Sequence, residues 1–158
     1  MLNINIICVG KVKEKYLKDA ISEYSKRLSK YCKLNIIEIA DEPIPSNLSE
    51  KLSENIKNIE GNKILNNIKN TYVISLDLKG KEFSSEQFAK NLENITLKSS
   101  SITFIIGGSL GLSSEVIHNS NEIICFSKMT FPHQLIRFFL LEQIFRAFKI
   151  SHGETYHR

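Results

Sequence analysis

The sequence predicts an α/β fold: a single domain with a mostly parallel sheet and helices on both faces. Short apolar segments alternate with longer helical patterns along the chain, which is typical of βαβ units. The short segments are apolar without a break, as strands buried on both faces are. The length of 158 residues is that of one compact domain, so we expect residues 1–158 to form a single unit.

Five segments rich in isoleucine and nearly free of charge have the composition of buried strands. They are residues 4–9, 34–39, 72–78, 102–106 and 123–126. In parallel sheets of this kind, ligands bind beyond the carboxyl ends of the strands. Three loops are therefore candidates for a binding site: residues 77–80, 107–111 and 127–132.

The segment between the first two strands has apolar residues at helical spacing and lysines on its opposite side. The lysines are Lys15, Lys18, Lys26 and Lys30. Such a face either follows a phosphate backbone or is simply solvated, and solvation is the commoner case.

Two further helices are expected before the last two strands. Residues 48–68 have a helical pattern whose apolar stripe changes face after Gly61, which predicts a kink or boundary there. Ser84 and Gln87 have the spacing of a capping box, so the next helix is expected to begin at Ser84.

The final helix, over residues 131–150, is apolar in nearly every direction, and Pro132 suits its first turn. A helix that is apolar all round must be buried all round. In so small a domain, one side of this helix can pack on the sheet of its own chain, and the opposite side is most simply buried by another copy of the chain. We therefore predict a homodimer. Glu142 and Arg146, four residues apart in this helix, are expected to pair with each other.

Several classes of protein are excluded by composition. The longest uncharged stretch, residues 99–114, is interrupted by three glycines and several serines, which rules out a membrane span. The N-terminus lacks the cationic start of a secretory signal, so a cytoplasmic protein is expected. The three cysteines are scattered and the four histidines have no ligand spacing, so we expect no disulfide framework and no metal.

The net charge of +4 is unevenly distributed. Residues 1–35 carry eight lysines and arginines against three acids, whereas residues 36–126 carry eight against twelve and residues 127–158 five against two. Basic ends around an acidic middle suit an anionic partner, although an excess of this size is often only a solvated surface.

The glycine-rich loop at residues 107–111 follows a predicted strand directly. It is neither a dinucleotide-binding fingerprint nor a P-loop, because the required glycine and lysine positions are absent. It does match G-x-S-x-G, with Ser109 in the nucleophile position, and His133 or His157 with Glu115 or Glu142 are possible triad partners. A serine hydrolase is therefore one alternative, and an ordinary tight turn explains the same residues.

The C-terminal tail places Tyr156, His157 and Arg158 in succession. An aromatic ring, an imidazole and a guanidinium together offer stacking, proton transfer and phosphate binding, the combination that holds an RNA base. His133, in the first turn of the final helix, is as well explained by a structural role as by a functional one.

Five motifs are distributed along the chain: VGKVKE at residues 9–14, GGSLG at 107–111, SKMTFPHQ at 127–134, EQIFRAFKI at 142–150 and GETYHR at 153–158. Together they resemble the RlmH-type large-subunit ribosomal RNA methyltransferases of the SPOUT class. The resemblance implies that the C-terminal part of the sheet is threaded into a trefoil knot. It also implies S-adenosylmethionine as the methyl donor and N3 of a pseudouridine in 23S rRNA as the acceptor.

The same resemblance implies a donor pocket formed by residues of the three candidate loops: Leu76, Gly108, Ser127, Lys128, Met129, Thr130, Phe131 and Pro132. The proton on N3 must leave, and we expect His157 or Arg158 to accept it or to stabilise the resulting anion. Tyr156 is expected to position the base. His133 is a weaker candidate for handling the proton. No metal is required for this chemistry.

A net charge of +4 provides only weak electrostatic attraction to RNA. We therefore expect a folded substrate such as the assembled ribosome, recognised by the surface of the dimer. Besides the hydrolase, a third hypothesis is a non-catalytic ribosome-binding protein that has the fold of the methyltransferases.

Overall fold

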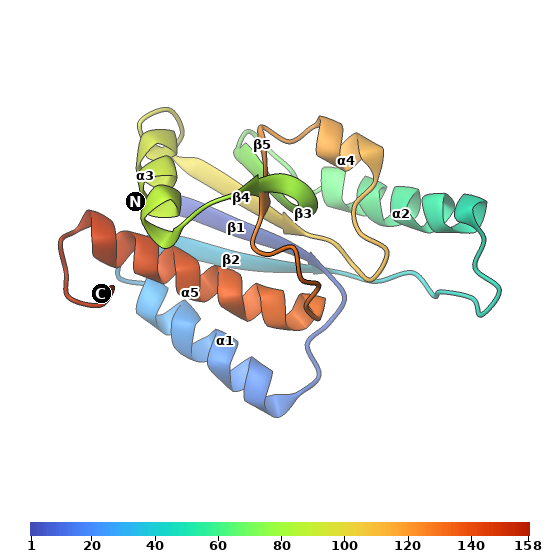
Figure 1. The fold of residues 1–158 in the computed structure, drawn as a ribbon, viewed down its shortest axis with the longest axis horizontal. Helices are drawn as coiled ribbons and strands as arrows, with labels where there is room; N and C mark the ends of the chain where they lie inside the picture. The colour runs from blue at the N-terminus through green and yellow to red at the C-terminus, as the bar shows by residue number, and fades with distance from the viewer.

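A five-stranded sheet forms the middle layer of the computed structural model, which describes residues 1–158 (Figure 1). The strands lie in the order β2-β1-β4-β3-β5, and every neighbouring pair is parallel. The prediction of a parallel sheet is thereby confirmed. The strands are β1 (Leu2–Val9), β2 (Cys32–Ile39), β3 (Tyr72–Glu82), β4 (Ser101–Ile106) and β5 (Glu122–Cys125).

Helices cover both faces of the sheet, as predicted (Figure 1). One face carries α1 (Lys15–Leu28), α3 (Ser85–Thr96) and α5 (His133–Ser151), with α5 packed between the other two. The opposite face carries α2 (Glu50–Leu65) and α4 (Ser114–His118). No helix has both the length and the apolar composition that crossing a bilayer requires.

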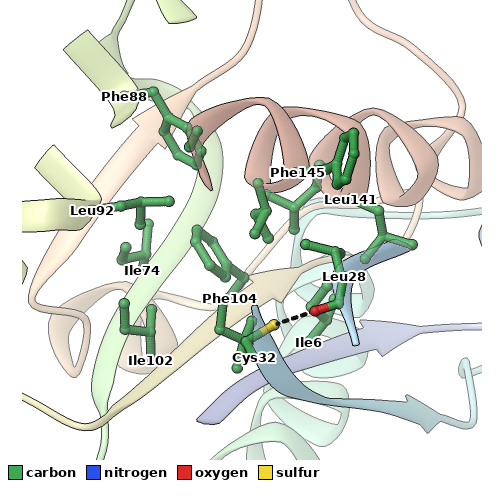
Figure 2. Packing of buried hydrophobic residues seen from close by; sticks show 14 of the residues in the cluster. Ile6, Leu28, Cys32, Ile74, Phe88, Leu92, Ile102, Phe104, Leu141 and Phe145 are labelled. Atoms are coloured by element: carbon green, nitrogen blue, oxygen red, sulfur yellow. Dashed lines mark hydrogen bonds between the residues drawn. The ribbon is translucent and has the colours of Figure 1, made fainter. Parts of the chain in front are cut away.

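Alternate residues of the central strands point into two separate cores, which explains why the strands are apolar without a break. In β1, Ile4 and Ile6 belong to the larger core, whereas Ile7 belongs to the smaller one beneath α2 and α4. Figure 2 shows Phe104 of β4 packed between the sheet and α5 in the larger core. Each fully buried side chain of this size contributes about 1.5–3 kcal/mol of transfer free energy.

The expected kink at Gly61 is wrong, because α2 runs through this residue without interruption. Gly61 is buried at the place where α4 crosses α2. A Cβ atom there would lie 2.4 Å from Ser113 Oγ and 3.3 Å from Val116 Cγ2. The change in apolar stripe therefore marks close packing against a second helix and not a break in the first.

The expected start of α3 is confirmed. Ser84 Oγ accepts a hydrogen bond from Gln87 N at 3.1 Å, and Gln87 Oε1 accepts one from Ser84 N at 2.9 Å, so both halves of the capping box are present. This cap fixes the point at which the chain leaves β3 and turns along the sheet toward α5.

The strand β3 is longer than predicted and is interrupted by a short excursion. Leu76 and Lys81 both pair with Ile124 of β5, so the four residues between them leave the ladder. Residues 77–80, expected as a loop, are instead an irregular part of β3, and pairing with β5 resumes beyond them up to Glu82. The trefoil knot that the resemblance implies stays a prediction.

Candidate functional site

A cavity of about 450 Å³ opens where β4, β5 and the first part of β3 end. Its wall consists of three segments, residues 76–79, 106–111 and 125–131 without Lys128, together with the beginning of α5. These segments overlap the three loops selected from the sequence. The volume lies within the range of small-molecule and cofactor sites.

The structure brings six of the eight predicted donor-binding residues together in the wall of this cavity. They are Leu76, Gly108, Ser127, Met129, Thr130 and Phe131. The other two lie outside the wall: the Lys128 side chain is exposed, and Pro132 is the N-cap residue of α5.

The glycine loop is shaped by close contacts of its backbone. Gly111 N donates a hydrogen bond to Gly108 O at 3.1 Å, and Gly111 has a φ of 88°, a value that glycine adopts without strain. A Cβ atom on Gly108 would lie 3.1 Å from Val9 Cγ1. The loop therefore packs tightly against the end of β1 and presents its main chain to the cavity.

The loop after β5 is held by two local contacts. Met129 N donates to Ser127 Oγ at 3.0 Å, and Cys125 Sγ donates to Ser127 O at 3.1 Å. Met129 is 72% exposed although it lines the cavity, so its thioether lies at the mouth. The Phe131 ring packs edge-on against Phe139 of α5, with centroids 5.7 Å apart.

Sequence reasoning missed an ion pair beside the cavity, between the buried Arg137 and the exposed Glu38. Arg137 is 2% exposed; its guanidinium donates to Glu38 Oε2 at 2.7 Å and to Gly10 O at 3.2 Å. Burial alone would raise the pKa of Glu38, but the hydrogen bonds from Arg137 and Val12 N outweigh it and lower that pKa. The pair ties the ends of β1 and β2 to the first turns of α5.

His133 lines the cavity one turn before Arg137. Burial, and then the charge of Arg137, lower the pKa of His133 below its usual value. A lowered pKa keeps the imidazole neutral at pH 7, the form that a proton acceptor needs.

A buried carboxylate, also missed from the sequence, supports the glycine loop from behind. Glu60 of α2 is 5% exposed, and its Oε2 accepts a hydrogen bond from Glu42 N at 2.9 Å. Its Oε1 would lie 3.5 Å from a Cβ atom on Gly108. Burial, partly offset by the Glu42 hydrogen bond, raises the pKa of Glu60.

The predicted catalytic residues of the tail do not lie at the cavity of their own chain. His157 Nε2 is 2.7 Å from Glu86 Oε1, and His157 Nδ1 is 3.0 Å from a guanidinium nitrogen of Arg146. His133 and Arg146 are thirteen residues apart on α5, which corresponds to about 20 Å of helix. The tail and the cavity thus belong to opposite ends of α5.

The tail is anchored at that far end by side chains other than its last residue. Tyr156 packs edge-on against Phe145, and its hydroxyl is 3.1 Å from that of Tyr24. Burial, and then the Tyr24 hydrogen bond, raise the pKa of Tyr156 to about 12, so the hydroxyl keeps its proton. Arg158 is exposed and makes no hydrogen bond or ion pair.

The tail also carries a charged anchor. Glu154 accepts hydrogen bonds from Lys149 Nζ at 2.6 Å and from the Tyr31 hydroxyl at 2.9 Å, which together lower the pKa of Glu154 to about 2. The expected pairing of Glu142 with Arg146 is confirmed, with a distance of 2.8 Å.

The geometry gives no support to the hydrolase alternative. The Ser109 side chain is exposed and has no hydrogen bond to a histidine or a carboxylate. The next helix, α4, begins only at Ser114, whereas a nucleophile elbow passes from strand to helix at the serine itself. His157 and Glu142, two of its possible partners, are engaged at the other end of α5.

No group of three or more histidine, cysteine, aspartate or glutamate side chains is arranged to hold a metal ion, and all three cysteines are free and buried. Parallel topology, loops rich in main-chain groups and a mainly apolar wall define an α/β protein with a candidate site for a small organic ligand at the carboxyl edge of its sheet.

Comparison with known proteins narrows this class. A family model described as "Predicted SPOUT methyltransferase" matches residues 2–157. The chain therefore belongs to the SPOUT methyltransferase family and is a methyltransferase.

Individual relatives agree with this assignment. The chain is 64% identical to "Ribosomal RNA large subunit methyltransferase H" of Clostridium botulinum (strain Eklund 17B / Type B), over 99% of this chain and 100% of the relative. A protein of the same name from Clostridium acetobutylicum is 60% identical with the same coverage. A solved structure, of a probable methylase family protein from Haemophilus influenzae, has a TM-score of 0.54 at 11% identity. That match covers 98% of this chain and 70% of the other, and it shows a shared fold.

Proposed function

We propose that this protein is a large-subunit ribosomal RNA methyltransferase that transfers a methyl group from S-adenosylmethionine to N3 of a pseudouridine in 23S rRNA, on assembled ribosomes. The observation that carries the proposal is the single cavity formed by the three strand-end loops, with six predicted donor-binding residues in its wall. The names of the full-length relatives support ribosomal RNA as the acceptor.

The residues of the cavity fit this donor. Leu76, Met129 and Phe131 offer apolar surface for an adenine ring, and the main chain around Gly108 offers donors and acceptors for its polar edge. When bound, S-adenosylmethionine supplies an electrophilic methyl group. The protein must then align the acceptor with the donor and deal with the proton on N3.

Among the tail residues, the hydrogen bonds favour Arg158 for the electrostatic role. Both ring nitrogens of His157 are engaged, because Nδ1 accepts from Arg146 and Nε2 donates to Glu86. Arg158 has no partner in its own chain and can approach an anion on the uracil ring. Tyr156, whose hydroxyl stays protonated, suits positioning, and His133 offers a neutral imidazole beside the cavity for the proton.

A second copy of the chain would complete the site. The outward side of α5 is only half-buried at Leu135, Phe138 and Phe139, where full burial was expected. A second cavity, of about 440 Å³, runs along this side between α5 and the start of α3. Phe131 lines both cavities, so a partner seated on α5 would lie next to the donor cavity.

We therefore propose a homodimer in which α5 packs against α5 of the partner. A two-fold axis across this helix places the C-terminal end of one α5 near the N-terminal end of the other. The tail of each subunit would then reach the cavity of its partner, which removes the separation of about 20 Å found within one chain.

Complementation between two inactive variants tests this arrangement. One variant carries Arg158→Ala and the other Gly108→Val, whose side chain would press on Val9 and Glu60 behind the glycine loop and push the loop out of place in the cavity wall. We expect each to be inactive alone and an equal mixture, refolded together, to recover about a quarter of wild-type activity, because half of the dimers contain one intact composite site. A mixture as inactive as its components would show that each site uses its own tail.

Transfer of labelled methyl tests the function itself. Ribosomes from a bacterium lacking this modification are incubated with the protein and labelled S-adenosylmethionine, and the modified nucleotide is mapped. Transfer to N3 of a pseudouridine in 23S rRNA is the expected result. Ribosome binding without any donor binding in calorimetry would favour the non-catalytic ribosome-binding protein, and covalent labelling of Ser109 by a fluorophosphonate would favour the hydrolase.

A further inference from the structure

A basic and aromatic surface at the beginning of α1 has no part in the proposed function so far. It consists of Lys11, Lys13, Tyr16 and Lys18, which we call the Tyr16 surface. Tyr16 is 71% exposed, and the three lysines are exposed as well.

The Tyr16 surface is attached to the rim of the donor cavity. It begins directly after Gly10, where a Cβ atom would lie 3.5 Å from Nε2 of His133, a residue of the cavity wall. Arg137 donates to Gly10 O at 3.2 Å and fixes this approach. In Figure 1 the connection from β1 to α1 leaves the sheet at the edge where α5 begins.

Tyr16 differs from the other four tyrosines in having no internal partner. The hydroxyls of Tyr24 and Tyr156 bond to each other, that of Tyr31 to Glu154, and that of Tyr72 to Glu122. Tyr16 makes neither a hydroxyl hydrogen bond nor a ring contact. Its ring is thus an exposed aromatic plane with nothing in the chain to explain it.

The lysines around this ring are not neutralised. Of the two acids in the segment, Asp19 pairs with Lys15 at 2.8 Å and Glu14 makes no ion pair. Glu38, the acid of β2, forms its hydrogen bonds with Arg137 and Val12 N, and the charge of Lys11 helps to lower its pKa without forming a salt bridge. Lys11, Lys13 and Lys18 form no salt bridge, so their charge is free to meet an anion.

We propose that the Tyr16 surface binds the rRNA segment next to the acceptor nucleotide, with Tyr16 stacked on an unpaired base and Lys11 and Lys13 on the neighbouring phosphates. An exposed aromatic ring among free cations is the arrangement by which proteins hold single-stranded RNA. A position beside the cavity rim suits a strand whose next nucleotide enters the site. This inference rests on the proposed function for the identity of the RNA.

The test compares variants of this surface with matched variants at the opposite edge of the sheet. The test variants are Tyr16→Ala, Tyr16→Phe and the double change Lys11→Gln with Lys13→Gln. The controls are Leu97→Ala, which removes another highly exposed side chain, and Lys69→Gln with Lys98→Gln, which removes the same charge near the amino ends of β3 and β4. Ribosome binding at several salt concentrations, KM for ribosomes, and donor affinity are measured.

We expect Tyr16→Ala to weaken ribosome binding on the order of 5- to 100-fold, whereas Tyr16→Phe stays within about twofold of wild type. The double lysine variant should reduce the slope of log K against log salt concentration by about 2. Donor affinity and the free energy of unfolding should be unchanged in all variants, and the controls should bind ribosomes as wild type does.

The inference fails if Tyr16→Ala binds ribosomes as tightly as Leu97→Ala does. It also fails if Tyr16→Phe is as weak as Tyr16→Ala, because dependence on the hydroxyl would indicate a polar contact, as with a ribosomal protein, in place of stacking. If wild type binds ribosomes without transferring methyl but Tyr16→Ala binds more weakly, the proposed function fails and the Tyr16 surface stands.

Discussion

Replacing Arg158 with alanine is expected to lower kcat for methyl transfer to ribosomes by about 10²–10³, with no change in donor affinity. A loss of this size is typical when one donor that stabilises a developing anion is removed. Arg158 is exposed and makes no hydrogen bond or ion pair in its own chain, so its removal should leave the free energy of unfolding within about 0.5 kcal/mol of wild type. The measurements are single-turnover transfer at saturating ribosome concentration and urea unfolding.

This change is cleaner than deletion of the tail. Removing residues 153–158 should also abolish transfer, but it breaks the Tyr156–Tyr24 and Glu154–Lys149 hydrogen bonds and so disturbs α1 and α5 together. Arg27→Gln is the matched control, because Arg27 is the other exposed arginine, and it should retain wild-type kcat. An Arg158→Ala protein with full kcat would remove Arg158 from the chemistry.

The elements of the fold were predictable because each depends on residues close together in the sequence. The strands are apolar without a break, and Ser84 and Gln87 form a cap within one turn of helix. The error at Gly61 has the opposite origin. Its close contact is with Ser113, more than fifty residues away in the sequence. An apolar stripe that changes face is expected both for a kinked helix and for a straight helix that packs against a second partner, so the sequence does not distinguish the two.

The site was predictable only in part, for the same reason. Parallel topology brings the strand-end loops together, so their convergence follows from the order of the elements. The Arg137–Glu38 pair joins residues 99 positions apart. A buried arginine needs a partner, but the residues around Arg137 in the sequence do not indicate which acid that partner is. The tail was assigned to the cavity from its residue types, whereas its position is set by Tyr24, Tyr31 and Glu86 on other elements.

The irregular segment of β3, residues 77–80, contains the second position at which we expect a substitution to have a large effect, Gly80. Gly80 lies against the backbone of β5: a Cβ atom there would be 2.5 Å from Ile124 C and 2.7 Å from Ile123 C. Backbone atoms cannot rotate aside as a side chain can, so Gly80→Ala must separate the two strands. Because β5 has β3 as its only neighbour in the sheet, the separation would weaken its attachment and expose Ile124, which is 1% exposed.

We expect Gly80→Ala to lower the free energy of unfolding by about 3 kcal/mol, the upper end of the usual cost of overpacking. Donor affinity should fall at least about tenfold in the same variant, because residues 77–79 and 125–131 form two of the three cavity loops and both move with the strands. Urea unfolding and calorimetric titration with S-adenosylmethionine provide the two measurements.

Gly111→Ala separates this effect from the general cost of replacing a glycine in a cavity loop. A Cβ atom on Gly111 meets nothing within 4 Å, so only its φ of 88° opposes alanine, at a cost of about 1–2 kcal/mol. A Gly80→Ala protein no less stable than Gly111→Ala would mean that β3 and β5 can move apart freely. In that case the shape of the donor cavity would not depend on the contact between these two strands. It would depend on the packing of α5 alone.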